Sequence, residues 1–218
     1  MSASPPETET SRWYADKVAR HGYDHRGLGF RTRSSQEKRF EALLALGDFH
    51  GRTLLDVGCG FGDLLAFLHE RGIRPAYTGI DICEPMILRC RSRFPDSGAR
   101  FYVSDVLAHQ PAQMPDFVVA SGIFGLDARD ARARIRPTLQ RMFSWAREGV
   151  AVNFLSRRSL DPAEGRVYVD PAEALEAAFS LTPAAILDHT YLPNDFTIHL
   201  YKTPAWQRVP GSAHETSV

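Results

Sequence analysis

The sequence predicts an α/β protein with a doubly wound, mostly parallel sheet, and three observations support this. A short apolar run at residues 54–57 leads through a glycine loop into an amphipathic helix. Four more strand-like runs follow at residues 77–81, 100–104, 116–120 and 149–155, with helical segments between them. These runs are almost continuously apolar, which is typical of parallel strands that are buried on both faces.

The first strand, loop and helix occupy residues 53–68. Gly58, Gly60 and Gly62 form a loop with little side-chain bulk. Apolar residues then recur at helical spacing, namely Leu64, Leu65, Phe67 and Leu68. Such a loop allows a ligand to contact the backbone at the N-terminus of the helix.

The glycine spacing and two acids indicate which ligand this loop binds. A dinucleotide-binding turn has the pattern G-x-G-x-x-G, but here the third glycine comes one position early and Asp63 stands where the last glycine would be. A carboxylate there would repel a pyrophosphate. Asp56 adds a second negative charge at the end of the strand. The two acids favour a ligand with cationic groups, such as the ammonium and sulfonium of S-adenosylmethionine (SAM).

The segment D-V-G-C-G-F-G at residues 56–62 resembles motif I of the class I SAM-dependent methyltransferases, [DE]-x-G-x-G-x-G. The resemblance implies SAM as methyl donor and S-adenosylhomocysteine as product. It also implies that Asp56, Gly58, Cys59 and Gly60 bind the cofactor. A glycine-rich loop of another α/β protein, such as a dehydrogenase, is the alternative.

The second strand, residues 77–81, ends in Asp81. In βαβ nucleotide-binding folds an acid at this place takes the ribose hydroxyls, because a carboxylate accepts two hydrogen bonds from a diol. A helix N-cap is the alternative role. Glu84 and Pro85 then open a helix with Met86 on its apolar face. We expect Ile82 and Met86 to lie beside the cofactor too.

The resemblance also assigns the ends of the third and fourth strands. It implies that Asp105 receives the exocyclic amine of adenine and that the backbone of Val106 meets the ring. Ser121 follows the fourth strand and is expected at the floor near the methyl group, where the family has its motif IV.

The last third of the chain predicts a capped helix and two more strands. Asp170 and Glu173 form a helix start, and strands are expected at residues 184–189 and 196–201 around a turn at 192–195. In the family this ending is an antiparallel C-terminal hairpin. The resemblance therefore implies a seven-stranded sheet in the order 3-2-1-4-5-7-6.

Four segments are expected along the chain. Residues 1–10 are predicted to be a disordered tail, residues 11–51 an N-terminal helical lid, residues 52–203 the SAM-binding core, and residues 204–218 a C-terminal tail. In the lid segment, Ser34 and Glu37 resemble a capping box that opens a helix. The alternative is a helix and loop that only pack on the sheet.

Site residues outside the motifs are predicted from residue type. Arg31, Gln36 and Arg39 are candidates for the methionine carboxylate of SAM, because the planar fork of an arginine matches a carboxylate. Another arginine group is expected on the exposed face of a helix: Arg129, Arg132, Arg134 and Arg136.

The acceptor pocket is expected to contain Tyr14, His25, Tyr168 and Asn194. Transfer of the methyl group is an in-line displacement that requires alignment and exclusion of water. A base is needed only for a protonated acceptor. His25, in the lid, is the preferred candidate base, and no catalytic residue is assigned.

Composition limits the partners. The chain has 218 residues with 26 basic and 26 acidic side chains, and this balance argues against a broad nucleic-acid surface. Residues 120–124 lack the Asn/Asp-Pro-Pro-[Tyr/Phe] signature of enzymes that methylate amines of nucleic-acid bases. We therefore expect a small-molecule acceptor, methylated on oxygen or nitrogen. An RNA or protein methyltransferase and a non-catalytic SAM-binding domain are the alternatives.

The cysteines and the apolar stretches predict a cytoplasmic protein without a metal. Cys59, Cys83 and Cys90 show no paired metal-ligand spacing. The first ten residues lack the features of a signal peptide, and no stretch is long enough to span a bilayer. The oligomeric state is not predicted.

Overall fold

The computed structural model describes residues 9–22, 28, 32–126 and 131–207. Its helices are α1 (Glu9–His21), α2 (Arg33–Leu44), α3 (Asp63–Glu70), α4 (Glu84–Arg93), α5 (Ala131–Trp145) and α6 (Pro171–Phe179), followed by the short 3-10 turn η1 (Ala205–Gln207). Its strands are β1 (Thr53–Val57), β2 (Ala76–Asp81), β3 (Arg100–Val103), β4 (Phe117–Ala120), β5 (Gly149–Leu155), β6 (Ala185–Leu192) and β7 (Asp195–Tyr201).

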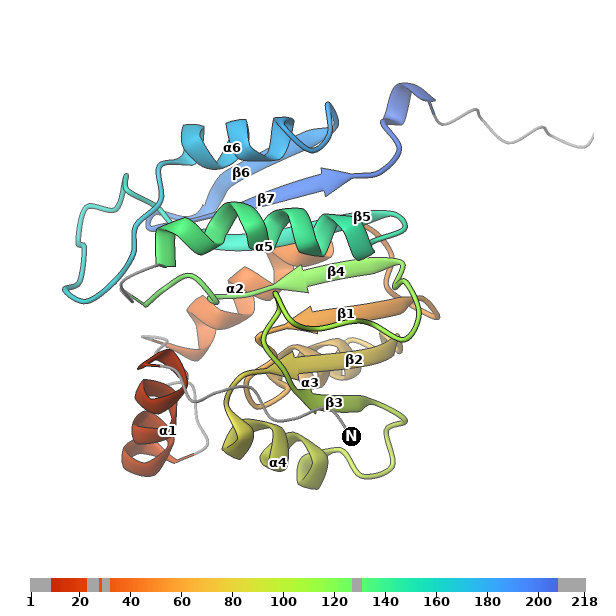
Figure 1. Ribbon diagram of the computed structural model, residues 1–218, viewed down its shortest axis with the longest axis vertical. Helices are drawn as coiled ribbons and strands as arrows, with labels where there is room; N and C mark the ends of the chain where they lie inside the picture. The colour runs from red at the N-terminus through yellow and green to blue at the C-terminus, as the bar shows by residue number, and fades with distance from the viewer. Residues whose placement is uncertain (1–8, 23–27, 29–31, 127–130, 208–218) are drawn as a thin grey trace, which may run out of the picture.

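The strands form one seven-stranded sheet in the order β3-β2-β1-β4-β5-β7-β6 (Figure 1). The pairs from β3 to β5 are parallel, and β7 pairs antiparallel with both β5 and β6. The predicted fold class, strand order and antiparallel hairpin are therefore confirmed. The carboxyl ends of β1, β2, β3 and β4 lie at one edge, which is where ligands bind in open α/β sheets.

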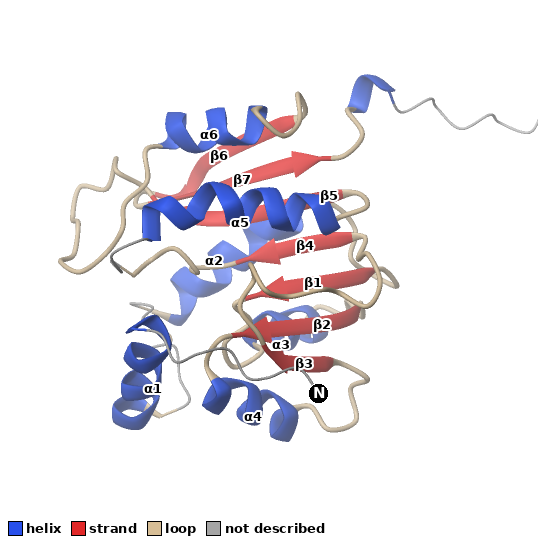
Figure 2. Cartoon of the chain, viewed as in Figure 1, coloured by secondary structure: helices blue, strands red, loops and turns tan. Residues whose placement is uncertain are grey.

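Helices cover both faces of the sheet, as Figure 2 shows. Leu55 and Val57 of β1 pack in the core under α5 and α6, whereas Leu54 points to the opposite core, under α2, α3 and α4. This alternation of side chains along a buried strand explains why the run in the sequence is apolar without a period.

Helix α1 lies beyond the carboxyl ends of the parallel strands, on the left of Figure 1. It starts at Glu9, so Glu9 and Thr10 belong to a helix and not to the tail that we assigned to residues 1–10. Residues 1–8 of that tail, and residues 208–218 of the C-terminal tail, lie outside the described residues. The role of residues 11–51 as a lid remains a prediction.

The capping box predicted for α2 is wrong. The N-cap is Thr32, whose Oγ1 accepts a hydrogen bond of 3.1 Å from the amide of Ser35. Glu37 instead pairs with Arg33, one turn earlier, at 2.9 Å. The helix therefore begins one residue before Ser34, because a threonine just upstream provides the same cap.

The C-terminal hairpin is longer than predicted. Strand β6 extends to Leu192 and β7 begins at Asp195, which leaves Pro193 and Asn194 as the turn. The predicted cap of α6 is confirmed, since Asp170 Oδ1 accepts from the amide of Ala172 at 2.9 Å. No helix in the described ranges is long and apolar enough to cross a membrane.

Candidate functional site

The loop after β1 brings its backbone close to the loop after β4. Gly58 has a φ of +71°, and a Cβ at this position would lie 2.2 Å from Cγ2 of Ile123. A side chain here would both strain the backbone and collide with a branched neighbour. Glycine is therefore required for the two loops to form a common wall.

Asp81 holds this loop in place from the end of β2. Its Oδ2 accepts a hydrogen bond of 3.0 Å from the amide of Gly60, and its Oδ1 accepts one of 2.8 Å from the amide of Cys83. Burial raises the pKa of this carboxyl, and the backbone donors offset part of the rise. Each carboxylate oxygen still has a lone pair for a ligand hydroxyl.

Asp56, at the end of β1, is only 3% exposed. Its Oδ2 accepts a hydrogen bond of 2.5 Å from the hydroxyl of Tyr77. Burial raises the pKa of Asp56 to about 7, with the Tyr77 hydrogen bond acting in the opposite direction and the Asp81 charge adding to the rise. A cation bound nearby would therefore lower the pKa of Asp56 and favour its negatively charged form.

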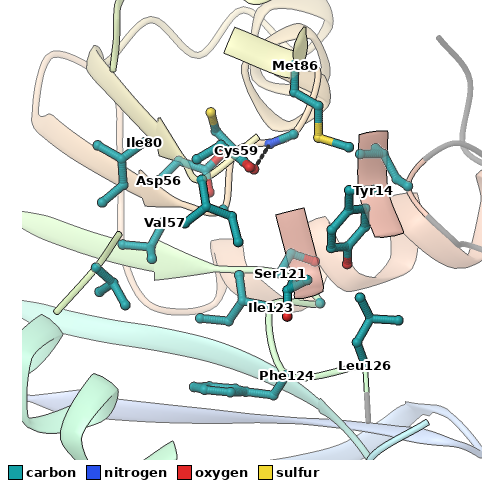
Figure 3. Close-up of a pocket in the computed structure, with 18 of the residues that line it drawn as sticks. Tyr14, Asp56, Val57, Cys59, Ile80, Met86, Ser121, Ile123, Phe124 and Leu126 are labelled. Atoms are coloured by element: carbon teal, nitrogen blue, oxygen red, sulfur yellow. Dashed lines mark hydrogen bonds between the residues drawn. The ribbon is translucent and has the colours of Figure 1, made fainter. Parts of the chain in front are cut away.

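A cavity of about 240 Å³ opens between these loops and the helices α1, α2 and α5. The strand ends contribute its acids and glycines, and the helices contribute aromatic and polar side chains. In Figure 3, Tyr14 stands on the α1 side with its hydroxyl directed toward the part of the cavity formed by Ser121 and Leu126. Burial raises the pKa of Tyr14 to about 12, so the hydroxyl stays protonated near neutral pH.

Apart from Arg39 and from Arg31, which lies outside the described residues, every predicted cofactor residue lines this one cavity. The residues concerned are Asp56, Gly58, Cys59, Gly60, Asp81, Ile82, Met86, Asp105, Val106 and Ser121. They come from the ends of four strands and the start of α4, because parallel strands bring their carboxyl ends to one edge of the sheet. Their binding role is still a prediction.

Arg39 is not among the lining residues of the cavity. It is 7% exposed and forms a double hydrogen bond with Asp195, with Nε at 2.7 Å from Oδ1 and Nη2 at 2.5 Å from Oδ2. This pair joins α2 to the first residue of β7. Gln36, one turn before Arg39, does line the cavity and donates to Asp63 at 3.2 Å.

The predicted acceptor residues are separated in the structure. Tyr14 lines the cavity, whereas Tyr168 and Asn194 are not among its lining residues. The Tyr168 hydroxyl accepts from the amide of Ala163 at 2.7 Å, and the Asn194 amide donates to Asp195 at 3.1 Å. His25 lies outside the described residues, as does Arg31.

Arg134 is a site residue that the sequence did not identify. It lines the cavity, and its Nη2 donates to Asp105 Oδ2 at 2.6 Å. Of the arginine group predicted to form an exposed face, Arg132 and Arg136 are exposed, Arg134 is half-buried, and Arg129 lies outside the described residues. No signal in the sequence identifies Asp105 as the partner of Arg134, because the two residues lie 29 positions apart on different elements. The lining residues that were not predicted also include Glu9, Thr10, Leu28, Phe40, Leu126 and Thr138.

Comparison with known proteins identifies the family. A family model described as a methyltransferase domain matches residues 54–149. Rv1506c of Mycobacterium tuberculosis, a protein named as a methyltransferase, is 33% identical over 162 residues, which is 69% of this chain and 93% of the relative. The chain belongs to the class I SAM-dependent methyltransferases. SAM is the methyl donor of this family.

Other similar proteins are methyltransferases too. Trans-aconitate 2-methyltransferase of Escherichia coli O1:K1 is 40% identical over 68 residues, covering 31% of this methyltransferase and 26% of the relative. Among solved structures, magnesium protoporphyrin IX methyltransferase of Synechocystis PCC 6803 with bound SAM has a TM-score of 0.64 at 15% identity, covering 91% of this chain and 100% of that one. The DhpI complex with S-adenosylhomocysteine has a TM-score of 0.66 at 18% identity, covering 94% and 100%. At these identities the likeness to the solved structures concerns the fold.

Proposed function

We propose that this methyltransferase transfers the methyl group of SAM to an oxygen or nitrogen of a small-molecule acceptor. The observation that carries the proposal is the convergence of Asp56, Asp81 and Asp105 on one cavity beside a glycine loop. Three acids at the ends of three neighbouring strands fit a ligand with a diol, an exocyclic amine and a cationic end.

The ribose is proposed to lie against Asp81. The two oxygens of this carboxylate are fixed by the amides of Gly60 and Cys83, so their orientation does not depend on the ligand. Their remaining lone pairs suit the two hydroxyls of a ribose. Met86, fully buried beside this position, supplies an apolar surface.

The adenine is proposed to lie at Asp105 and Val106. Asp105 Oδ1 accepts from the amide of Leu107 at 2.7 Å and Oδ2 accepts from Arg134. The carboxylate is thereby held in one orientation, with further lone pairs for an amine. Val106 contributes an apolar side chain to the same wall.

The methionine end is proposed to lie over Gly58 and Gly60, near Asp56. Asp63 lies on this side and accepts a hydrogen bond from Gln36 of α2. Asp56, whose pKa burial raises to about 7, ionises more readily when a cation binds beside it. Arg39, which we predicted for the methionine carboxylate, is less suited to this role, because its guanidinium pairs with Asp195.

The acceptor is proposed to enter between Tyr14 and the loop from Ser121 to Leu126. The names of two similar proteins state small acceptors, trans-aconitate and magnesium protoporphyrin IX, which supports a small molecule here as well. SAM supplies a methyl group on a sulfonium, which leaves as a neutral thioether. The chain orients the acceptor in line with that bond and excludes water with Leu28, Ile123 and Phe124.

The test is mass spectrometry of a protein-free metabolite extract incubated with SAM and the purified protein. We expect S-adenosylhomocysteine together with a metabolite that gains one methyl group. The control is the Asp81→Ala variant, which should form neither product. Binding of SAM without any methylated product would instead favour a non-catalytic SAM-binding domain, and salt-sensitive binding of RNA would favour an RNA methyltransferase.

A cytoplasmic location is proposed from the cysteines. Cys59, Cys83 and Cys90 are all described, buried and free. Free thiols are usual in a reducing compartment.

A further inference from the structure

We propose that the acceptor of this methyltransferase is an uncharged aromatic molecule, and that Phe124 and Tyr14 are the residues that select it. The inference rests on the proposed function and narrows its substrate class. It depends on the acceptor end of the cavity, which lies between Tyr14 of α1 and the loop from Ser121 to Leu126.

Apolar side chains line the acceptor end, namely Leu28, Ile123, Phe124 and Leu126. Leu28 lies against the glycine loop, since a Cβ on Gly60 would be 2.7 Å from its Cδ2. Small-molecule sites are usually of this kind, with an apolar wall and a few polar groups that fix the orientation of the ligand. An acceptor with a large apolar surface would therefore be stabilised by burial here.

The ring of Phe124 is held rigidly in this wall. It stacks on Phe154 of β5, with the ring centroids 5.3 Å apart and an angle of 1° between the planes. Phe154 in turn stacks on Phe196 of β7, at 5.2 Å and 19°. Figure 3 shows the Phe124 ring beside the cavity, close to Ile123. A ring in a fixed orientation can pair with a second aromatic ring by offset stacking or by an edge-to-face contact.

Tyr14 brings one polar group to the same end. Its side chain packs against the buried cluster of Phe61, Cys83 and Met86, and the ring of Trp13 meets it edge-on at 5.0 Å. Its hydroxyl is directed toward the part of the cavity formed by Ser121 and Leu126 (Figure 3). The packing of α1 therefore places a hydroxyl that can donate or accept one hydrogen bond.

The charges around Tyr14 disfavour a charged acceptor. Burial raises the pKa of Tyr14 to about 12, the charge of Asp81 adds to the rise, and the charge of Arg166 opposes it. The same burial and the same carboxylate would destabilise an anion bound beside the hydroxyl. A cation there would be repelled by the sulfonium of SAM. An uncharged acceptor avoids both penalties.

An uncharged aromatic molecule that carries a hydroxyl or an aromatic amine fits this end of the cavity. Its ring would contact Phe124, and its polar group would form a hydrogen bond with the hydroxyl of Tyr14. Both contacts are made to the acceptor and not to the cofactor. Loss of either contact should therefore raise the KM for the acceptor and leave the KM for SAM nearly unchanged.

The first test identifies the class of acceptor. A protein-free metabolite extract is divided at pH 7 between ethyl acetate and water, and each fraction is incubated with the protein and SAM that carries a radiolabelled methyl group. We expect label transfer in the ethyl acetate fraction, which holds uncharged apolar molecules, and a labelled product with the ultraviolet absorption of an aromatic ring.

The second test uses the acceptor purified from that fraction. Phe124→Leu keeps an apolar side chain but removes the ring, and Tyr14→Phe removes only the hydroxyl. We expect each variant to raise the KM for the acceptor by about fivefold and to change the KM for SAM by less than about twofold. Phe179→Leu and Tyr102→Phe are the matched controls, because both residues are exposed, and they should leave both KM values unchanged.

Transfer confined to the aqueous fraction, or a product without aromatic absorption, would overturn the substrate class and leave the proposed function standing. An unchanged KM for the acceptor in either site variant would overturn the role of that residue. Failure to transfer label in both fractions would contradict the proposed function itself.

Discussion

Arg134 donates a hydrogen bond of 2.6 Å to Asp105, and both side chains line the cavity where we place the adenine of SAM. Arg134 belongs to α5 and Asp105 follows β3, so the contact joins a helix to the end of a strand that lies earlier in the chain. It binds Oδ2 of the carboxylate, whereas the Leu107 amide binds Oδ1. Cofactor binding should therefore depend on an arginine outside the glycine motif.

Replacing Arg134 by alanine should weaken SAM binding modestly. The ion pair is partly exposed, with 37% of the arginine side chain and 19% of the aspartate side chain accessible, so screening by water limits its strength. We expect the Kd for SAM to rise about threefold, which corresponds to roughly 0.7 kcal/mol. Calorimetric titration measures this. Arg136→Ala, an exposed arginine of the same helix, should have no effect, and equal effects of the two variants would contradict the role of Arg134.

Gly58→Ala should abolish SAM binding. A Cβ at Gly58 would lie 2.2 Å from Ile123 Cγ2, in the wall of the cavity. Gly98 is a matched control, because its φ of +72° is almost the same and no heavy atom lies within 4 Å of its Cβ position. Gly98→Ala should cost about 1–2 kcal/mol of stability from backbone strain alone and leave the Kd unchanged. Measurable SAM binding by a folded Gly58→Ala protein would contradict the packing of these loops.

Asp56 should make the unliganded protein less stable as the pH rises. Burial raises the pKa of Asp56 from 3.8 to about 7, so the folded chain keeps a proton that the unfolded chain has released. The stability from this group is complete below about pH 4 and is lost as the pH rises through about 7.

Asp56→Asn isolates this effect, since an amide oxygen can still accept from Tyr77 and does not titrate in this range. We expect the Tm of the variant to rise relative to wild type between pH 5 and about pH 8, as measured by circular dichroism. A difference in Tm that stays constant over this range would show that Asp56 is ionised in the folded protein throughout.

The buried pair of Arg39 and Asp195 should contribute strongly to stability. Their side chains are 8% and 2% exposed, and removing the arginine leaves a buried carboxylate without its guanidinium. We expect Arg39→Ala to lower the free energy of unfolding by about 3–5 kcal/mol in urea denaturation. Arg33→Ala breaks an exposed pair with Glu37 and should cost less than about 1 kcal/mol. Similar losses for the two variants would contradict the importance of the buried pair.

The sequence predicted those parts of the site that depend on the strands. Asp56 and Asp81 lie in the last two residues of β1 and β2, and Asp105 lies two residues after β3. Parallel strands place residues at their carboxyl ends along one edge of the sheet. The same reasoning placed Ser121 after β4. The strand pattern in the sequence was sufficient to predict these site residues, because each one is positioned by its own strand.

The roles of the long side chains could not be predicted in this way. Arg39 pairs with Asp195, 156 positions later, and Arg134 pairs with Asp105 on another element. Each arginine reaches a partner that the packing of the helices determines, and helix spacing alone does not specify it. The acceptor end depends in addition on α1, whose position over the strand ends no local pattern indicates.

The most direct test of the central claim is a calorimetric titration of the protein and two aspartate variants with S-adenosylhomocysteine. We expect saturable binding at one site by wild type and by Asp96→Ala, which alters an exposed acid near the start of β3. We expect at least about a hundredfold loss of affinity for Asp81→Ala, from the lost ribose contacts and the unpaired Gly60 and Cys83 amides. Wild-type affinity in a folded Asp81→Ala protein would contradict the placement of the cofactor at the ends of β1 and β2.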